Sequence, residues 1–376
     1  MLKNKIYKYL SIEIFKSFLT ILLTFTAIAW TVRAVNFLDL MIEDGYSMII
    51  YLKYSMLNIS TIITRFIPLS FLLSMIISIS KFQSQKELLI LWTTGLNKMK
   101  VVNIFLLIGL TVVILQIVLS VIVNPLLLNK SRTLLKDTAE NQINSMLKTK
   151  DFSDAFEGVT FYVNQKKSNN ELIGVFINDS SGSLSMIIND ANTQSSSTIF
   201  AERGFIDGKK IILFSGSIQS LNKKKEIKII NFEKTELNID NFSTRTIKQP
   251  KIQETSSYFL FQCLINKNTS KLRKNCKIDN HVLIEHLSRR IGMPLYIPLV
   301  SVITSLLLVQ QREKKINFLN NYFLFSFAFV VLIFAEITLK YSGFSLINFI
   351  GYFFSPIILL IILYLYLAKK MTIKNI

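Results

Sequence analysis

The chain has 376 residues, of which 51% are hydrophobic and 18% are charged, and its mean hydropathy is +0.42. An ordinary soluble domain carries about 25% charged residues, so this composition disfavours a cytosolic enzyme and excludes a disordered chain. The formal net charge of +19 is typical of proteins that bind nucleic acid. Two cysteines are too few for a disulfide framework or for a zinc site made of cysteines alone.

Six apolar runs without charged residues predict six transmembrane helices, because a bilayer core requires about 20 mostly apolar helical residues. The runs are 17–32, 66–80, 101–129, 291–311, 316–335 and 341–368. The first two are short, so they require Arg33 and Arg65 to lie at or just inside the membrane boundary. The basic start of the chain and Ala27-Ile28-Ala29 also resemble a cleaved signal peptide. Because the apolar run continues through Trp30, we expect an uncleaved first helix.

A β domain is predicted between the third and fourth helices. Residues 130–255 are rich in Asn, Ser, Lys and Thr, and their apolar residues alternate with polar ones. The alternation is clearest in GVTFYVNQKK, ELIGVFINDS, STIFAERGFIDGKKIILFSGSIQ and KKEIKIINFEKTELNID. These strands suggest an antiparallel sandwich or jelly roll. We therefore expect helices 1–3 in residues 1–129, a jellyroll-like β domain in 130–255, a connector in 256–289 and helices 4–6 in 290–376.

Basic residues concentrate on one side of the predicted membrane. The two terminal segments and the loops after runs 2 and 4 hold 14 basic residues against three acidic ones. The opposite short loops hold four basic and four acidic residues. By the positive-inside rule, both termini are expected in the cytoplasm and the β domain on the opposite side of the membrane. Most of the positive charge is then an orientation signal, and we expect no nucleic acid partner.

No motif for catalysis or for a cofactor is found. The chain lacks the GxxxxGK[ST] phosphate loop. Its two histidines, His281 and His286, are five residues apart and would point in different directions on a helix, so we expect no metal site. Cys263 and Cys276 lie in the external region, where either a disulfide or two unpaired thiols are possible.

The predicted cytoplasmic loop of residues 81–100 contains a short helix, about 82–95. Leu88, Leu91 and Trp92 would share one face of it, and Gly95 suits the left-handed residue after its end. The helix could rest on the lipid surface or dock into a groove on a cytosolic motor. Glu87 favours docking, because an acidic side chain is poorly suited to an anionic leaflet and well suited to a basic partner.

Arg33 and Arg65 are both expected near the outer-leaflet boundary. They could snorkel to the interface, or they could bind phosphate groups of an outer-leaflet lipid, since a guanidinium group matches phosphate geometry. The apolar side chains of the β domain could form a packed core or line a path for lipid. They include Phe161, Val175, Ile177, Phe200 and Phe214.

The chain resembles the LptF/LptG (YjgP/YjgQ) family of lipopolysaccharide export permeases over nearly its whole length. The segments that carry the resemblance are YLSIEIFKSFLTILL, AVNFLDLMIEDGYS, KELLILWTTGLNKMKV, FEGVTFYV, LIGVFIND, TIFAERG and EHLSRRIGMPLYIPLVSVIT. The stretches GVTFYV, GVFIND and RRIGMPLY are more similar to the LptF branch than to the LptG branch.

The resemblance implies a permease subunit of the bacterial inner membrane, with a periplasmic β domain and without enzymatic activity or cofactor. Its expected partners are a cytosolic ATPase dimer (LptB-like), a paralogous six-span permease (LptG-like), periplasmic bridge proteins with β-jellyroll domains (LptC/LptA-like) and lipopolysaccharide. Glu87 would be the acidic residue that couples to the ATPase, and Arg33 the basic residue at the outer end of helix 1; Arg65 matches no family position. The alternatives are another envelope lipid or lipoprotein-releasing permease and a membrane-anchored periplasmic scaffold without transport.

Overall fold

The computed structural model describes residues 2–42, 46–141, 147, 149–156, 158–167, 170–180, 197–207, 210–221, 227–238, 251–265, 276, 279–309 and 317–373. The chain is divided into two compact units. The helical unit comprises Met1–Thr31, Ile59–Leu128 and Lys251–Ile376, and the sheet unit comprises Val32–Asn58 and Asn129–Pro250.

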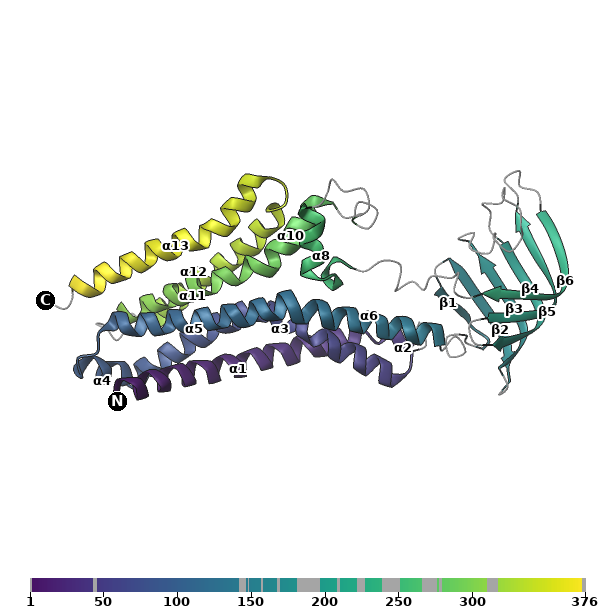
Figure 1. Cartoon of the computed structure of the whole chain (residues 1–376). Helices are drawn as coiled ribbons and strands as arrows, with labels where there is room; N and C mark the ends of the chain where they lie inside the picture. Colours follow the sequence, from purple (N-terminus) through teal and green to yellow (C-terminus); the bar gives the residue numbers. More distant parts are fainter. Residues whose placement is uncertain are drawn as a thin grey trace. The chain divides into compact units, whose positions relative to one another are not determined.

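Six stretches of helix in the described residues are long and apolar enough to cross a membrane, as the sequence predicts. The helical elements are α1 (Leu2–Asn36), α2 (Asp39–Ile42), α3 (Met48–Ser84), α4 (Glu87–Thr93), α5 (Lys98–Val118), the π-helix η1 (Leu119–Val123), α6 (Asn124–Asn141), η4 (Ile252–Glu254), α8 (Ser257–Ile265), α10 (Asn280–Ile291), η5 (Met293–Leu295), α11 (Tyr296–Ser305), η6 (Leu306–Val309), α12 (Asn317–Tyr341) and α13 (Leu346–Ile373). In the helical unit, α4 and both chain termini lie at one end and α8 lies at the other (Figure 1).

Two helices extend well beyond their apolar runs. Arg65 lies near the middle of α3, and the helix continues for about 26 Å from Arg65 back to Met48. After Asn129, where the third apolar run ends, α6 continues to Asn141. The ends of these helices beyond the apolar runs belong to the sheet unit.

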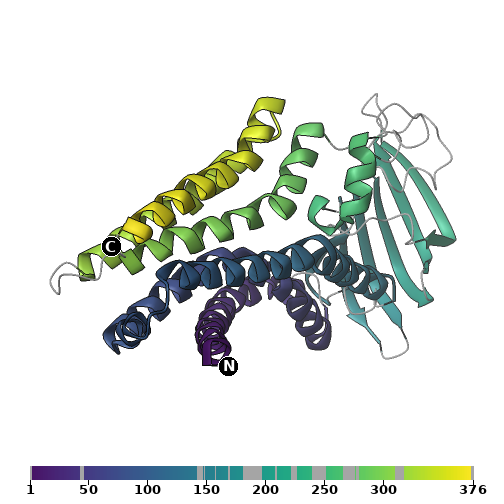
Figure 2. The same ribbon diagram turned by 60° about the vertical axis from the view of Figure 1, so that its left-hand side comes forward.

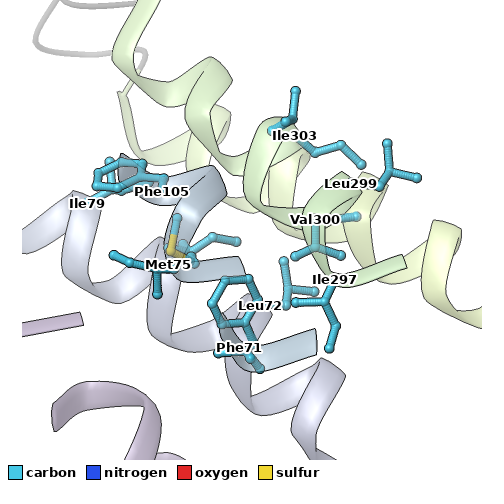
Figure 3. Close-up of a cluster of buried hydrophobic side chains, with 14 of the residues drawn as sticks. Phe71, Leu72, Met75, Ile79, Phe105, Ile297, Leu299, Val300 and Ile303 are labelled. Carbon is cyan, nitrogen blue, oxygen red and sulfur yellow. The ribbon is translucent and has the colours of Figure 1, made fainter. Parts of the chain in front are cut away.

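The core of the helical unit forms where α3, α5 and α11 meet. Figure 3 shows Phe71, Met75, Phe105 and Val300 among the buried side chains that these helices contribute. Gly109 lets α5 approach α11 closely, since a Cβ there would lie 3.2 Å from Ser301 Oγ. Small residues at such positions are typical of packed membrane helices, which gain van der Waals contact from close approach.

The helices differ greatly in how much of their surface the chain itself covers. The span of α10 and α11 is 83% buried within its apolar window, whereas α1 and α13 are 17% and 11% buried. The apolar surfaces of α1 and α13 are therefore left for lipid or for another protein, as expected of a subunit in a membrane complex.

Six strands form one antiparallel sheet, in which each strand pairs with the next one along the chain (Figure 2). The strands are β1 (Phe152–Phe156), β2 (Val159–Lys166), β3 (Glu171–Asp179), β4 (Ser197–Asp207), β5 (Lys210–Leu221) and β6 (Ile227–Asn238). The antiparallel β domain between the third and fourth membrane helices is thus confirmed. Strand β1 has no counterpart in the sequence prediction, because FSDAF is short and half polar.

One face of the sheet is buried within the sheet unit. Its apolar residues, among them Phe161, Val175 and Ile177, pack in one cluster with Leu40 of α2 and Leu135 of α6. The expected core role of Phe161, Val175 and Ile177 is confirmed, whereas Phe200 and Phe214, also considered for the interior, are 43% and 38% exposed.

Cys263 and Cys276 form a disulfide, which decides between the two possibilities that the sequence left open. The bond links α8 to the segment before α10. Cys263 packs with Leu260 and Leu283 in a small buried cluster. The bridge therefore holds α8 against α10 at the end of the helical unit where the chain returns from the sheet unit.

Candidate functional site

A groove with apolar walls and a charged end runs between α3 and α12 in the helical unit. Its volume is about 600 Å³. The apolar lining comes from Pro68 and Leu69 of α3, Met293, and the α12 side chains Phe329, Leu332, Ile333 and Ile337. Arg65, Glu336, Lys340 and Tyr341 supply the polar part of the lining. Such a combination suits an amphiphile with a hydrocarbon chain and an anionic head.

The charged end of this groove holds two basic side chains, Arg65 and Lys340, and one acidic side chain, Glu336. Arg289 of α10 donates two hydrogen bonds to the Glu336 carboxylate, at 3.3 and 3.1 Å. The negative charge of Glu336 is therefore balanced by a residue outside the groove lining. Arg65 and Lys340 contribute two basic side chains to the groove lining.

Arg65 also lines a smaller polar cavity of about 110 Å³ inside the helical unit. Gln116, Ser120, Asn124, His286 and Arg290 contribute further polar groups to it. Gln116 is 4% exposed, and its Oε1 has no hydrogen-bond partner in the structure. Arg65 thus lies where the groove between α3 and α12 meets a polar cavity, and its sequence signal was only the interruption of an apolar helix.

Arg290 fastens the returning chain to the helical unit. Its guanidinium group donates hydrogen bonds to the backbone oxygens of Thr255, Ile252 and Gln253, at 3.0, 3.1 and 3.3 Å, and to Ser257 Oγ at 2.6 Å. Arg290 is 7% exposed, so these neutral oxygens take the place of its hydration shell.

Ser120, Ser257 and Arg290 form a joint between helices, and two prolines explain the hydrogen bonds that its serines donate. In an α-helix the carbonyls of Val121 and Arg290 would accept from the N–H groups of residues 125 and 294, but both residues are prolines. The Ser257 hydroxyl donates to Val121 O at 2.9 Å, and the Ser120 hydroxyl donates to Arg290 O at 2.7 Å. The sequence analysis did not identify this joint, because its parts lie up to 170 residues apart.

Arg33, the second predicted lipid-binding residue, lies in the last turn of α1 and is partly buried. It belongs to the sheet unit, whereas Arg65 belongs to the helical unit. Arg33 and Arg65 therefore belong to different units of the chain.

The predicted coupling segment forms α4, but over a shorter range than expected. Residues 83 and 84 belong to α3, and the helical conformation is interrupted at Lys86, which has a φ of +59°. At the other end, Gly95 has a φ of +76°, as predicted for a left-handed residue after the helix. The N–H groups of Gly95 and Leu96 donate to the carbonyls of Trp92 and Leu91, which is a Schellman ending.

The apolar side chains of α4 point in two directions. Leu88 is 1% exposed, and Leu91 and Trp92 pack against the same core of the helical unit. Leu89 and Ile90 are 53% and 59% exposed. The predicted face of Leu88, Leu91 and Trp92 thus holds α4 on its own chain, and sequence reasoning missed the two residues that α4 presents outward.

Glu87 is fixed by the first helix. Tyr9 of α1 donates a hydrogen bond from its hydroxyl to Glu87 Oε1 at 3.0 Å. A second link joins α1 to α3, since Lys81 near the end of α3 forms an ion pair with Glu13 of α1. A groove of about 350 Å³ lies between α1 and α4, lined almost entirely by apolar atoms of residues that include Ile6, Leu10 and Ile90.

Four aromatic side chains form a row on the face of the sheet opposite its buried core. Phe152 pairs with Tyr162, Tyr162 with Phe176, and Phe176 with Phe200 across strands β1 to β4. Neighbouring rings in two of these pairs, Phe152–Tyr162 and Phe176–Phe200, have centroids 5.1 Å apart. A trough of about 570 Å³ borders Tyr162, Phe176 and Phe200.

Comparison with known proteins identifies the family. A family model described as lipopolysaccharide export system permease LptF/LptG matches residues 8–370. The chain is also similar to an uncharacterised protein of Rickettsia prowazekii (strain Madrid E), RP871, with 24% identity over 285 residues that cover 74% of this chain and 75% of the relative. Since the family match covers both membrane-helix regions and the sheet between them, this multi-pass membrane protein belongs to the LptF/LptG family of lipopolysaccharide export permeases, which are transmembrane subunits without catalytic activity.

Proposed function

We propose that this chain is an LptF-like permease subunit that takes lipopolysaccharide from the outer leaflet of the bacterial inner membrane and passes it to a periplasmic bridge. The observation that carries the proposal is the groove between α3 and α12, with apolar walls and two cationic residues, Arg65 and Lys340, at its polar end. Acyl chains would lie along the apolar walls, and the guanidinium group of Arg65 would bind a phosphate of the head. Arg33 remains a proposed second phosphate ligand.

The orientation that this function needs is supported by two independent features. Both termini and the α4 loop carry most of the short-loop basic charge, which favours the cytoplasm. The disulfide between Cys263 and Cys276 lies at the opposite end of the helical unit, and disulfides persist in the oxidising periplasm. The sheet would then be periplasmic, with both termini cytoplasmic.

Energy would come from a cytosolic ATPase dimer that docks on α4. Glu87, Leu91 and the turn at Gly95 are proposed contacts, and the exposed Leu89 and Ile90 extend them to a continuous surface. Leu88 and Trp92 would act by packing α4 onto the core, so that force on α4 reaches the membrane helices.

The aromatic row on the sheet is proposed as the surface along which acyl chains leave the membrane. Phe152 and Phe200 are 62% and 43% exposed, which leaves apolar area for a lipid or for the β-jellyroll domain of a bridge protein. A second permease of the LptG branch would complete the pair of subunits, and it would cover part of the exposed apolar surface of α1 and α13.

The test is photocrosslinking of lipopolysaccharide to a benzophenone residue in place of Leu69, in the complex purified from membranes. We expect lipid adducts in the native background and a loss of most adducts with Arg65→Glu, because a carboxylate would repel the lipid phosphate. Lys53→Glu, an exposed charge reversal on the same helix, is the control and should leave the yield unchanged. Equal yields from Arg65→Glu and the native chain would reject the phosphate role of Arg65, and purification of the chain without an ATPase subunit would favour a scaffold.

A further inference from the structure

The cytoplasmic half of α1 is attached both to the end of α3 and to the start of α4. Tyr9 donates a hydrogen bond to Glu87, Glu13 forms an ion pair with Lys81 just before α4, and Leu10 is 1% exposed. The three contacts lie within five residues of α1. They join α1 both to the end of α3 and to the first residue of α4.

The Glu87 carboxylate keeps one oxygen for another donor. Tyr9 donates to Oε1, and among the described side chains no cation forms an ion pair with Glu87. A neutral donor such as the tyrosine hydroxyl orients a carboxylate without neutralising it. Oε2 can therefore still accept a hydrogen bond from an external basic group.

The apolar groove beside this carboxylate belongs to both helices. Lys5, Ile6, Tyr9 and Leu10 come from α1, and Glu87, Ile90 and Leu91 come from α4. The groove has a volume of about 350 Å³, and its lining includes one acidic side chain, Glu87, and one basic side chain, Lys5. A partner with an apolar side chain next to a basic one would contact both helices when it enters.

The rest of α1 is attached to its own chain by a narrow stripe. Its buried apolar residues in the helical unit are Leu10, Ile14, Phe18 and Leu22, one per turn, and its other apolar residues are partly buried or exposed. A helix attached along a single stripe can tilt without opening a large cavity in the core. Displacement of the end of α1 at Tyr9 would therefore tilt the whole helix.

We propose that Tyr9 is a positioning residue that holds the Glu87 carboxylate at the edge of the groove shared by α1 and α4, so that a basic side chain of the ATPase subunit engages both helices and α1 moves together with α4. This inference rests on the proposed function. It identifies α1, rather than α4 alone, as the element that receives the force of ATP binding.

The test uses spin labels in the full complex of this chain, its permease partner and the ATPase. Labels at Lys8→Cys on α1 and Thr93→Cys on α4 replace exposed residues, and a label at Lys369→Cys on α13 serves as reference. The native cysteines are joined in a disulfide and do not compete for the label. We expect the distance between labels 8 and 93 to stay the same with and without trapped ATP, while the distance between labels 93 and 369 changes.

Tyr9→Phe removes only the hydroxyl. It should let the distance between labels 8 and 93 change on ATP trapping, and it should lower the lipid released per ATP hydrolysed by about threefold, as expected for loss of one partly exposed hydrogen bond to a charged group. Tyr7→Phe, two residues away and partly buried, is the matched control and should behave as the native chain.

Two results would overturn the inference and leave the proposed function intact. One is a distance between labels 8 and 93 that changes in the native complex; the other is a Tyr9→Phe complex that cannot be distinguished from Tyr7→Phe. Failure to recover any ATPase subunit with the native chain would instead contradict both the proposed function and the role of Tyr9.

Discussion

Arg290 shows how a buried cation can be structural in this family. All four of its hydrogen-bond partners are neutral oxygens, three of them carbonyls of the segment that returns from the sheet unit. A guanidinium group can reach several acceptors in one plane, whereas an ammonium group is a compact point charge with three donors. The geometry therefore requires arginine and not merely a positive charge.

We predict that Arg290→Lys lowers the free energy of unfolding by about 2 kcal/mol, because at least one carbonyl and the Ser257 hydroxyl lose their donor in a buried place. The measurement is thermal unfolding of the purified chain in detergent. Arg289→Lys is the control on the neighbouring residue. Its ion pair with Glu336 is partly exposed, so the cost should stay below about 1 kcal/mol. Equal losses for the two variants would contradict the structural role of Arg290.

At the scale of elements, α4 shows where sequence reasoning reaches its limit. Gly95 could be predicted in its left-handed conformation, since only glycine adopts it freely. Which side of α4 packs on its own chain could not be predicted, because Leu88 to Trp92 are five consecutive apolar residues and either side offers apolar side chains. Tertiary packing alone decides that Leu88 points inward and Leu89 outward.

This division of α4 leads to a prediction on ATPase binding. Leu89→Ser should lower the affinity for the ATPase by about tenfold, the effect of truncating an apolar anchor at a docking surface, and leave the melting temperature of the chain unchanged. Leu88→Ser, one residue away, should lower the melting temperature instead, because it places a hydroxyl in the core. The measurements are quantitative recovery of ATPase and thermal unfolding in detergent. If Leu88→Ser were the variant that kept its stability and lost ATPase, the assignment of the two faces would be reversed.

The strands were more predictable than the helix ends. Five of the six strands coincide with alternating segments such as ELIGVFINDS, since alternation directly reflects one buried and one exposed face. The extension of α3 from Arg65 back to Met48 was not foreseen, because those residues are neither continuously apolar nor clearly polar. Likewise, the joint of Ser120, Ser257 and Arg290 depends on contacts between distant segments, which no local pattern records.

At the scale of the molecule, hydrophobic runs and charge asymmetry account for most of what the sequence predicted. Six apolar runs became six helices because burial in lipid demands a minimum length of apolar helix, whatever the tertiary packing. The side on which the sheet lies follows from a different argument, in which loop charges and the disulfide agree. The two arguments use residues that do not overlap, so an error in one would not produce agreement with the other.

The orientation can be tested with a membrane-impermeant maleimide on intact spheroplasts. The native cysteines are bonded to each other, so a single introduced cysteine reports its own side. Ile229→Cys, 59% exposed on β6, should react from outside, whereas Lys8→Cys on α1 should react only in inverted vesicles. Reaction of both positions from the same side would mean an even number of membrane crossings between them and would contradict a periplasmic sheet. That result would also contradict the proposed route from the groove of Arg65 to the aromatic row, because lipid leaving the outer leaflet could no longer reach that surface.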